Sequence, residues 1–106
     1  MALVSMKEML QKARREHYGI GAFNIFNIES MEAVLEAAEE QKSPLILAFA
    51  EIMKSDINIE YISMVGRKMA EVASVPVALH LDHGQSYEYC LTALRHGFSS
   101  VMIDAS

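Results

Sequence analysis

The sequence predicts an α/β fold in which an initial helix and four parallel strands form the N-terminal half of a (β/α)8 barrel. Two uncharged apolar runs, Leu45–Ala50 and Val75–Leu79, are typical of strands buried on both faces of a parallel sheet. Helical segments alternate with the strands through short connections, which favours parallel strands and right-handed crossovers. No glycine-rich phosphate-binding sequence follows the first strand, and the chain stops at a strand. These observations favour a half-barrel over a small open sheet and assign residues 1–106 to one partial barrel domain.

The first helix is expected from about Ser5 to His17. Ser5 and Glu8 have the spacing of a capping box, in which each side chain satisfies a free backbone amide. Gly19 follows the segment and can end the helix. Apolar residues recur at helical spacing within it, at Met6, Met9, Leu10 and Ala13.

Four strands and three further helices are expected in alternation after the first helix. The strands are expected at Ile20–Ile25, Leu45–Ala50, Val75–Gly84 and Ser99–Asp104. Apolar residues at helical spacing indicate the helices: Met31, Val34, Leu35 and Ala38, then Ile62, Val65, Met69 and Val72, then Tyr87, Cys90, Leu91 and Leu94. Gly66 weakens the second of these helices by about 1 kcal/mol relative to alanine.

Composition and charge limit the kinds of partner that the chain can bind and the cellular compartment in which it is expected. With a net charge of −5, the chain is not expected to bind nucleic acid or an anionic membrane surface as its main partner. A phosphorylated small molecule is compatible with this charge, since local amides and one or two lysines can hold a phosphate. The single cysteine, Cys90, excludes an internal disulfide and fits a reducing cytoplasm. No stretch resembles a signal peptide or a transmembrane helix, so a cytoplasmic protein is expected.

Polar side chains gather where the predicted strands end. Asn24 ends the first strand, Asp82 and His83 end the third, and Asp104 and Ser106 lie at the end of the fourth. Because the carboxyl ends of parallel barrel strands share one rim, we expect these groups to converge. His83 carries an imidazole suited to zinc, and the adjacent carboxylate could accept or donate a proton.

The same residues also have plainer interpretations. Asp82 and His83 can simply shape a turn into the next helix, and one histidine is not a zinc site, which needs about three protein ligands. His80, between two leucines, is interpreted as a hydrogen-bonded core histidine, and Cys90 as a buried, inert thiol. Asp104 follows an apolar strand with no obvious solvated face, so neither interpretation is favoured for it.

Four sequence blocks resemble the N-terminal part of the class II, metal-dependent ketose-bisphosphate aldolases, the family of fructose- and tagatose-bisphosphate aldolases. The blocks are LVSMKEML at Leu3–Leu10, GAFNIFN at Gly21–Asn27, VPVALHLDHG at Val75–Gly84 and HGFSSVMIDAS at His96–Ser106. The likeness extends over the whole chain in register. It implies an eight-stranded TIM barrel roughly two to three times as long as this chain, within the usual size of that fold. This chain would supply the initial helix and the first four strands.

The resemblance also implies a reaction and a set of residue roles. The family reversibly cleaves a phosphorylated ketose, such as fructose or tagatose 1,6-bisphosphate, to dihydroxyacetone phosphate and an aldehyde. By position, Asp82 resembles the catalytic acid/base, which handles the proton of the hydroxyl beside the cleaved carbon–carbon bond. His83 resembles one of three histidines that hold the catalytic zinc, Asp104 a ligand of a second, noncatalytic metal, and Asn24 a substrate-binding asparagine. Zn²⁺ would polarise the ketose carbonyl and stabilise the enediolate. The expected partners are a phosphorylated sugar and further copies of the chain in a homo-oligomer.

Two departures from the family pattern keep an alternative open. Ala50 lies where the family usually has a serine that helps hold a substrate phosphate, which suggests a divergent paralogue. The other two zinc histidines, the phosphate loops and the loop carboxylate that acts as base are expected beyond Ser106. The alternative is a noncatalytic half-barrel that acts as a binding or assembly module. For the isolated chain we expect no aldol cleavage, and self-association through its open sheet edges and through inward-facing residues near Leu47 and Leu79.

Overall fold

The computed structural model describes residues 3–106, in which helices and strands alternate as the sequence predicts. In chain order the elements are α1 (Met6–Glu16), β1 (Gly21–Asn24), α2 (Ile28–Glu40), β2 (Leu45–Ala50), η1 (Glu51–Ser55), α3 (Ile59–Val72), β3 (Val77–Gly84), α4 (Tyr87–Arg95) and β4 (Ser100–Ile103). The 3-10 helix η1 is the one element here that the sequence pattern does not predict. None of the helices among the described residues is long and apolar enough to cross a membrane.

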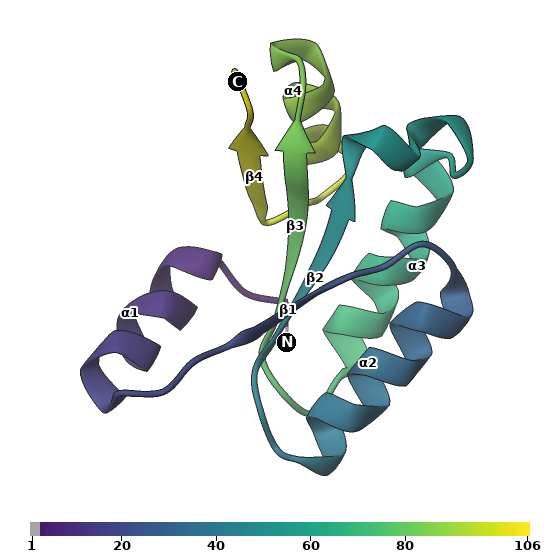
Figure 1. The fold of residues 1–106 in the computed structure, drawn as a ribbon. Coiled ribbons are helices and arrows are strands. Elements are labelled where there is room, and N and C mark those ends of the chain that lie inside the picture. Colours follow the sequence, from purple (N-terminus) through teal and green to yellow (C-terminus); the bar gives the residue numbers. More distant parts are fainter. Residues whose placement is uncertain (1–2) are drawn as a thin grey trace.

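The four strands form one parallel sheet in the order β1-β2-β3-β4 (Figure 1). Each strand therefore lies beside its neighbour in the sequence, as in the predicted half-barrel. Asn24 pairs with Ala48, and Ala48 in turn pairs with His80. Ala50, at the end of β2, pairs with Asp82. The strand ends that carry polar residues thus meet at one edge of the sheet.

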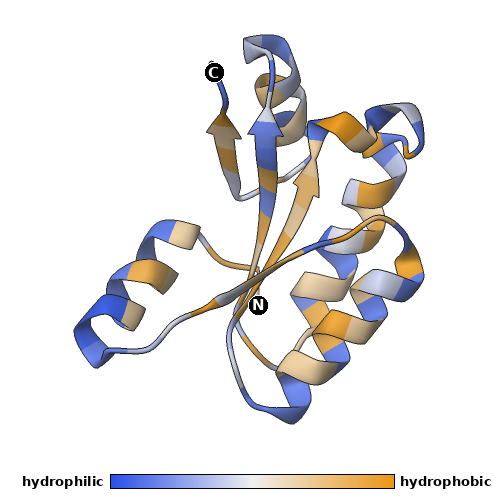
Figure 2. Ribbon diagram, in the orientation of Figure 1, coloured by the Kyte–Doolittle hydropathy of each residue, from blue (hydrophilic) through white to orange (hydrophobic). Residues whose placement is uncertain are grey.

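The main core lies between the sheet and the helices α2, α3 and α4, which cover one face (Figure 1). Strand residues such as Leu47, Phe49 and Leu79 are fully buried there. On the other face, α1 covers the beginnings of the strands, where Met9 packs with Ile46 and Ala78. Figure 2 shows β3 changing from hydrophobic at its start to hydrophilic at its carboxyl end.

The structure shows which residues near Leu47 and Leu79 face inward. Leu47 and Leu79 themselves belong to the core that the helices cover. The inner face carries the alternate residues of the same strands, among them Ala48 and His80, because successive side chains of a strand point to opposite faces. Self-association through the inner face would therefore involve these alternate residues and not Leu47 or Leu79.

Helix α3 has the predicted helical spacing, and three of its four predicted apolar residues meet the core: Ile62 is buried, and Val65 and Met69 pack against the core while partly exposed. Its buried residues are Ile59, Ile62, Ser63, Gly66 and Ala70. Val72, which the predicted stripe places in the core, is 67% exposed. The centre of the packed side therefore consists of small residues, which let the helix approach the sheet closely. A Cβ placed on Gly66 would lie 3.4 Å from Leu79 Cδ1, an ordinary contact distance.

Candidate active site

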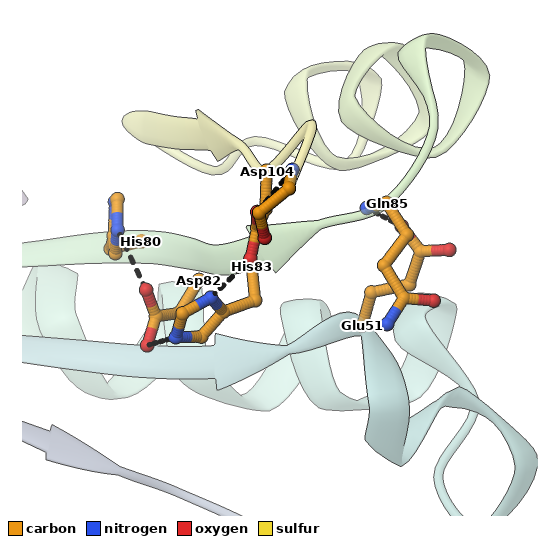
Figure 3. A network of polar contacts seen from close by, with 7 residues as sticks. Glu51, His80, Asp82, His83, Gln85 and Asp104 are labelled. Atoms are coloured by element: carbon orange, nitrogen blue, oxygen red, sulfur yellow. Dashed lines mark hydrogen bonds and ion pairs between the residues drawn. The ribbon is translucent and has the colours of Figure 1, made fainter.

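The carboxyl ends of β3 and β4 bring Asp82, His83 and Asp104 together, as the sequence predicts. His83 Nδ1 lies 2.9 Å from Asp104 Oδ2, and His83 Nε2 lies 3.8 Å from Asp82 Oδ2 (Figure 3). The His83 side chain is 57% exposed, so it stands at the rim and not in the core. An imidazole flanked by two carboxylates, one held by a hydrogen bond, is a group that can bind a metal or relay a proton.

The backbone of β3 is distorted where it presents His83. His83 has a φ of 49°, in the left-handed region, and the β3–β4 register shifts between Leu81 and Gly84. Gly84 allows this path, since a Cβ there would lie 2.6 Å from Cys90 Sγ and 2.9 Å from Met102 O. The Asp104 amide donates to Gly84 O at 2.7 Å, which joins the two strands beyond the bulge. A bulge at a strand end can re-aim a side chain, and here His83 points toward Asp104.

The charges of this pair stabilise each other. The hydrogen bond to Asp104 raises the pKa of His83, and the nearby Asp82 carboxylate raises it further. The pKa of Asp104 falls to about 2, because its carboxylate accepts hydrogen bonds first from the Ser106 hydroxyl and then from His83. The pair is therefore held as imidazolium and carboxylate more strongly than either group would be alone.

Asp82 has a second histidine on its other side. His80 Nε2 lies 3.8 Å from Asp82 Oδ1, and His80 Nδ1 shares a hydrogen bond of 2.8 Å with Ser100 Oγ. Burial lowers the pKa of His80, and the Asp82 charge opposes that shift. The predicted hydrogen-bonded histidine is confirmed, although it lines the inner face of the sheet and not the helix-covered core.

Asn24 lies at the end of β1, and its side chain is exposed. It pairs with Ala48, which pairs with His80, so Asn24 is level with a residue two positions before Asp82. Ala50 lies directly beside Asp82, so β2 offers no hydroxyl at that position. Cys90 is buried, as predicted. Among the predicted site residues, Asp82, His83 and Asp104 therefore meet, whereas a substrate-binding role for Asn24 stays a prediction.

The sequence pattern misses Glu51, the first residue after β2. Its carboxylate is buried, and it accepts a hydrogen bond of 2.7 Å from the Gln85 amide, just beyond the Asp82–His83 pair (Figure 3). The available signal is an acidic residue directly after a continuous apolar strand. Ser100 is also a partner of the site that becomes visible only from the contacts, whereas Ser106, which the sequence places at the end of the fourth strand, donates a hydrogen bond to Asp104.

The described residues do not complete a metal site by themselves. Within residues 3–106 no three side chains of histidine, cysteine, aspartate or glutamate are close enough to hold one ion. The chemistry of the group nevertheless fits zinc. The Nδ1 atom of His83 bonds to a carboxylate, so Nε2 is the nitrogen that can bind a metal once its proton has left, the usual arrangement around ligating histidines. The chain thus offers one oriented imidazole and needs ligands from elsewhere.

The fold and the site can be compared with known proteins. Residues 4–106 match the family described as class-II fructose-bisphosphate aldolase. A fructose-bisphosphate aldolase of Thermus caldophilus is 56% identical over 104 residues, covering 98% of this chain and 34% of that protein. A 6-phospho-5-dehydro-2-deoxy-D-gluconate aldolase of Bacillus licheniformis is 51% identical over 114 residues, covering 100% of this chain and 37% of that protein.

A solved structure agrees with these relatives. The YdjI aldolase from Escherichia coli K12 superposes with a TM-score of 0.93 at 39% identity, over 98% of this chain and 40% of that one. The chain thus spans between about a third and two fifths of the length of the proteins it matches. The match confirms the predicted α/β barrel segment. The chain belongs to the class II fructose-bisphosphate aldolase family.

Proposed function

We propose that this chain is the N-terminal part of a zinc-dependent aldolase that reversibly cleaves a phosphorylated ketose to dihydroxyacetone phosphate and an aldehyde. The observation that carries the proposal is the convergence of Asp82 and His83 at the carboxyl edge of the sheet, in a chain of this family. The edge where parallel strands end is also the face on which barrel enzymes carry out their chemistry.

Asp82 is proposed as the catalytic acid/base. Its carboxylate is partly exposed and lies between His80 and His83, at 3.8 Å from each ring. In the cleavage direction it would take the proton of the hydroxyl beside the breaking carbon–carbon bond, and in the synthetic direction it would return that proton. The partly exposed carboxylate lies at the rim, where it can reach a bound sugar.

His83 would hold the zinc ion through Nε2, and Asp104 would orient its ring. A bound zinc ion supplies a positive charge that withdraws electrons from the ketose carbonyl. Asp104 Oδ2 is bonded to His83, and Oδ1 accepts from the amide and the hydroxyl of Ser106. The second metal position expected at Asp104 would therefore have to replace the Ser106 contacts.

The sugar is proposed as a class and not as one compound. Relatives named for fructose bisphosphate and for 6-phospho-5-dehydro-2-deoxy-D-gluconate match at 56% and 51% identity. Both names describe phosphorylated substrates, so fructose 1,6-bisphosphate, tagatose 1,6-bisphosphate and the gluconate are the compounds to assay. Asn24 is proposed to contact the sugar from β1, and Ala50 leaves the neighbouring position on β2 without a hydroxyl.

The surroundings of the enzyme are also proposals. The net charge of −5 supports a small-molecule partner in preference to nucleic acid or a membrane surface. The single buried cysteine supports a cytoplasmic location. The exposed Phe23 on β1 and Ile103 on β4 support a homo-oligomer or a completed barrel that covers them.

The test uses a protein that carries these residues in a complete barrel. Asp82→Ala should leave bound zinc unchanged, while turnover of the phosphorylated ketose falls by about two to four orders of magnitude. Asp56→Asn, which removes an exposed carboxylate from the C-terminal end of η1, is the control and should keep full turnover. Near-normal turnover in Asp82→Ala would remove Asp82 from the mechanism. A complete barrel that binds no metal and cleaves none of the three sugars would support the noncatalytic alternative.

A further inference from the structure

Glu51 is a buried carboxylate that the proposed reaction does not use. It is 1% exposed and opens η1 directly after β2. The residue before it, Ala50, pairs with Asp82 on β3, so Glu51 lies next to the level of the proposed acid/base. A carboxylate is costly to bury without partners, so its contacts should reveal what it holds.

The contacts of Glu51 divide between a charge and a backbone amide. Oε2 lies 3.0 Å from Lys54 Nζ, three residues along the chain, and Lys54 is itself about half exposed. Oε1 accepts a hydrogen bond of 2.7 Å from the amide of Gln85, 34 residues away. The lysine balances the charge from the solvent side, whereas the hydrogen bond from the Gln85 amide links the segment after β2 to the segment after β3.

The segment that Glu51 holds is the one that presents the candidate site. Gln85 follows Asp82, His83 and Gly84, where His83 adopts a left-handed conformation. On the β4 side, this turn is fixed by the bond from the Asp104 amide to Gly84 O, at 2.7 Å. On the β2 side, the bond from Gln85 to Glu51 is the matching attachment (Figure 3). The turn is thus held from both neighbouring strands.

We propose that Glu51 is a positioning residue, whose carboxylate ties the Gln85 amide to the end of β2 and thereby fixes the directions of Asp82 and His83. The catalytic consequence of this role rests on the proposed function, but the structural tie does not. A positioning role depends on the reach of the side chain more than on its charge.

Two conservative variants separate reach from charge. Glu51→Gln keeps the length of the side chain and an oxygen that can accept from Gln85, while the half-exposed Lys54 can turn to solvent. Glu51→Asp keeps the charge but is one methylene shorter, so it cannot hold the 2.7 Å bond without moving the backbone. If Glu51 positions the turn, glutamine should preserve the behaviour of the wild type and aspartate should not.

The chain offers a matched control at the opposite end of the sheet. Glu39, at the end of α2, accepts a hydrogen bond of 2.8 Å from the Ser74 amide, 35 residues away and just before β3. Glu39→Asp therefore removes the same kind of long-range tie, far from Asp82 and His83. It should loosen Ser74 and leave Gln85 unchanged.

The first measurement is hydrogen–deuterium exchange of the 106-residue chain, read by mass spectrometry with residue-level fragmentation at equal protein concentrations. In Glu51→Asp the Gln85 amide should exchange at least about tenfold faster, as expected for losing a hydrogen bond to a charged group. In Glu51→Gln and Glu39→Asp the Gln85 amide should exchange at the wild-type rate. The buried amides of β2 and β3 report whether any variant has unfolded as a whole. Unchanged Gln85 exchange in Glu51→Asp would overturn the proposal, as would equal losses in Glu51→Asp and Glu51→Gln.

The second measurement uses the complete barrel. There, Glu51→Asp should lower kcat by about ten- to a hundredfold with KM and zinc content unchanged, because misplaced groups weaken the chemical step more than substrate binding. Glu51→Gln should restore most of kcat. If the wild-type barrel cleaves no sugar, the proposed function fails while the exchange result still decides the role of Glu51. If Glu51→Asp retains full kcat while exchange at Gln85 rises, the tie exists but does not position the site, and the proposal is wrong.

Discussion

Replacing Gly84 by alanine tests whether the turn after Asp82 and His83 has room for a side chain. A Cβ on this residue would lie 2.6 Å from Cys90 Sγ, 2.9 Å from Met102 O and 3.1 Å from Leu81 Cδ2. The Cys90 and Leu81 atoms belong to side chains and can yield by small rotations. The Met102 oxygen belongs to the backbone of β4, so that strand has to move.

The expected cost lies at the upper end of the range for overpacked cores, about 3 kcal/mol. At roughly 4–8 °C per kcal/mol for a domain of this size, the melting temperature should fall by about 12–24 °C. Thermal unfolding followed by circular dichroism, at one fixed protein concentration, measures this directly. Because a shift of Met102 also moves β4, the contact between His83 and Asp104 should loosen as well.

Gly66→Ala is the matched control, since Gly66 is also buried but has room for a methyl group. The added Cβ would lie 3.4 Å from Leu79 Cδ1 and 3.6 Å from Met31 Sδ, both ordinary contacts. This variant should gain up to about 1 kcal/mol of helix propensity and melt at or above the wild-type temperature. A Gly84→Ala protein that melts within a few degrees of the wild type would refute the steric argument. So would equal losses in both variants.

Three further predictions concern the pair, the metal and the sheet edges. The His83–Asp104 pair should stabilise the fold mainly between about pH 4 and pH 6.5. The contribution of His83 is full below its unfolded pKa of 6.5 and disappears as the pH rises through its raised folded pKa. The contribution of Asp104 is full above its unfolded pKa of 3.8 and disappears as the pH falls toward its folded pKa of about 2. The difference in denaturation midpoint between wild type and Asp104→Asn should follow this window, and a difference that does not vary with pH would contradict it. The isolated chain should bind Zn²⁺ with a Kd weaker than about micromolar and cleave no ketose, because its described residues offer too few ligands. Calorimetry that shows tight zinc binding, abolished by His83→Ala, would contradict this prediction. The chain should also self-associate through the open edges of β1 and β4, and sedimentation of a monomer at about millimolar concentration would show that these edges need no cover.

The strands and their polar ends could be read from the sequence because they depend on local patterns. A run such as Leu45–Ala50 has no charged residue to expose, so burial on both faces is its only suitable environment. The position of Asp82 and His83 follows from the same reasoning, since the first polar residues after an apolar strand mark its end. That Asp104 would lie near them follows from the parallel order alone.

The contacts within the site could not be read in this way, because they depend on side-chain reach and on small backbone shifts. The bulge that turns His83 toward Asp104 involves packing between Gly84 and Cys90, which no spacing rule describes. The role of Glu51 could not be predicted because its partner is a backbone amide 34 residues away. Almost every residue carries such an amide, so the sequence does not single out the partner. The predicted stripe of α3 includes the buried Ile62 but omits the small buried residues Ser63, Gly66 and Ala70, which a search for large apolar side chains overlooks.

The strand order β1-β2-β3-β4 also bears on how the chain acquires its structure during synthesis. Gly21 pairs with Leu45, Leu45 with Val77, and His80 with Ser100, so each crossover closes a loop of one α-helix and its connections, with η1 added between β2 and α3. Parallel pairings of this kind form slowly, but each of them needs only segments that have already been made. As the chain leaves the ribosome, each new strand can add to the growing edge of a sheet that already exists. Assembly is therefore directional, and the contact between β3 and β4 at the polar edge forms only when Asp104 emerges and meets His83.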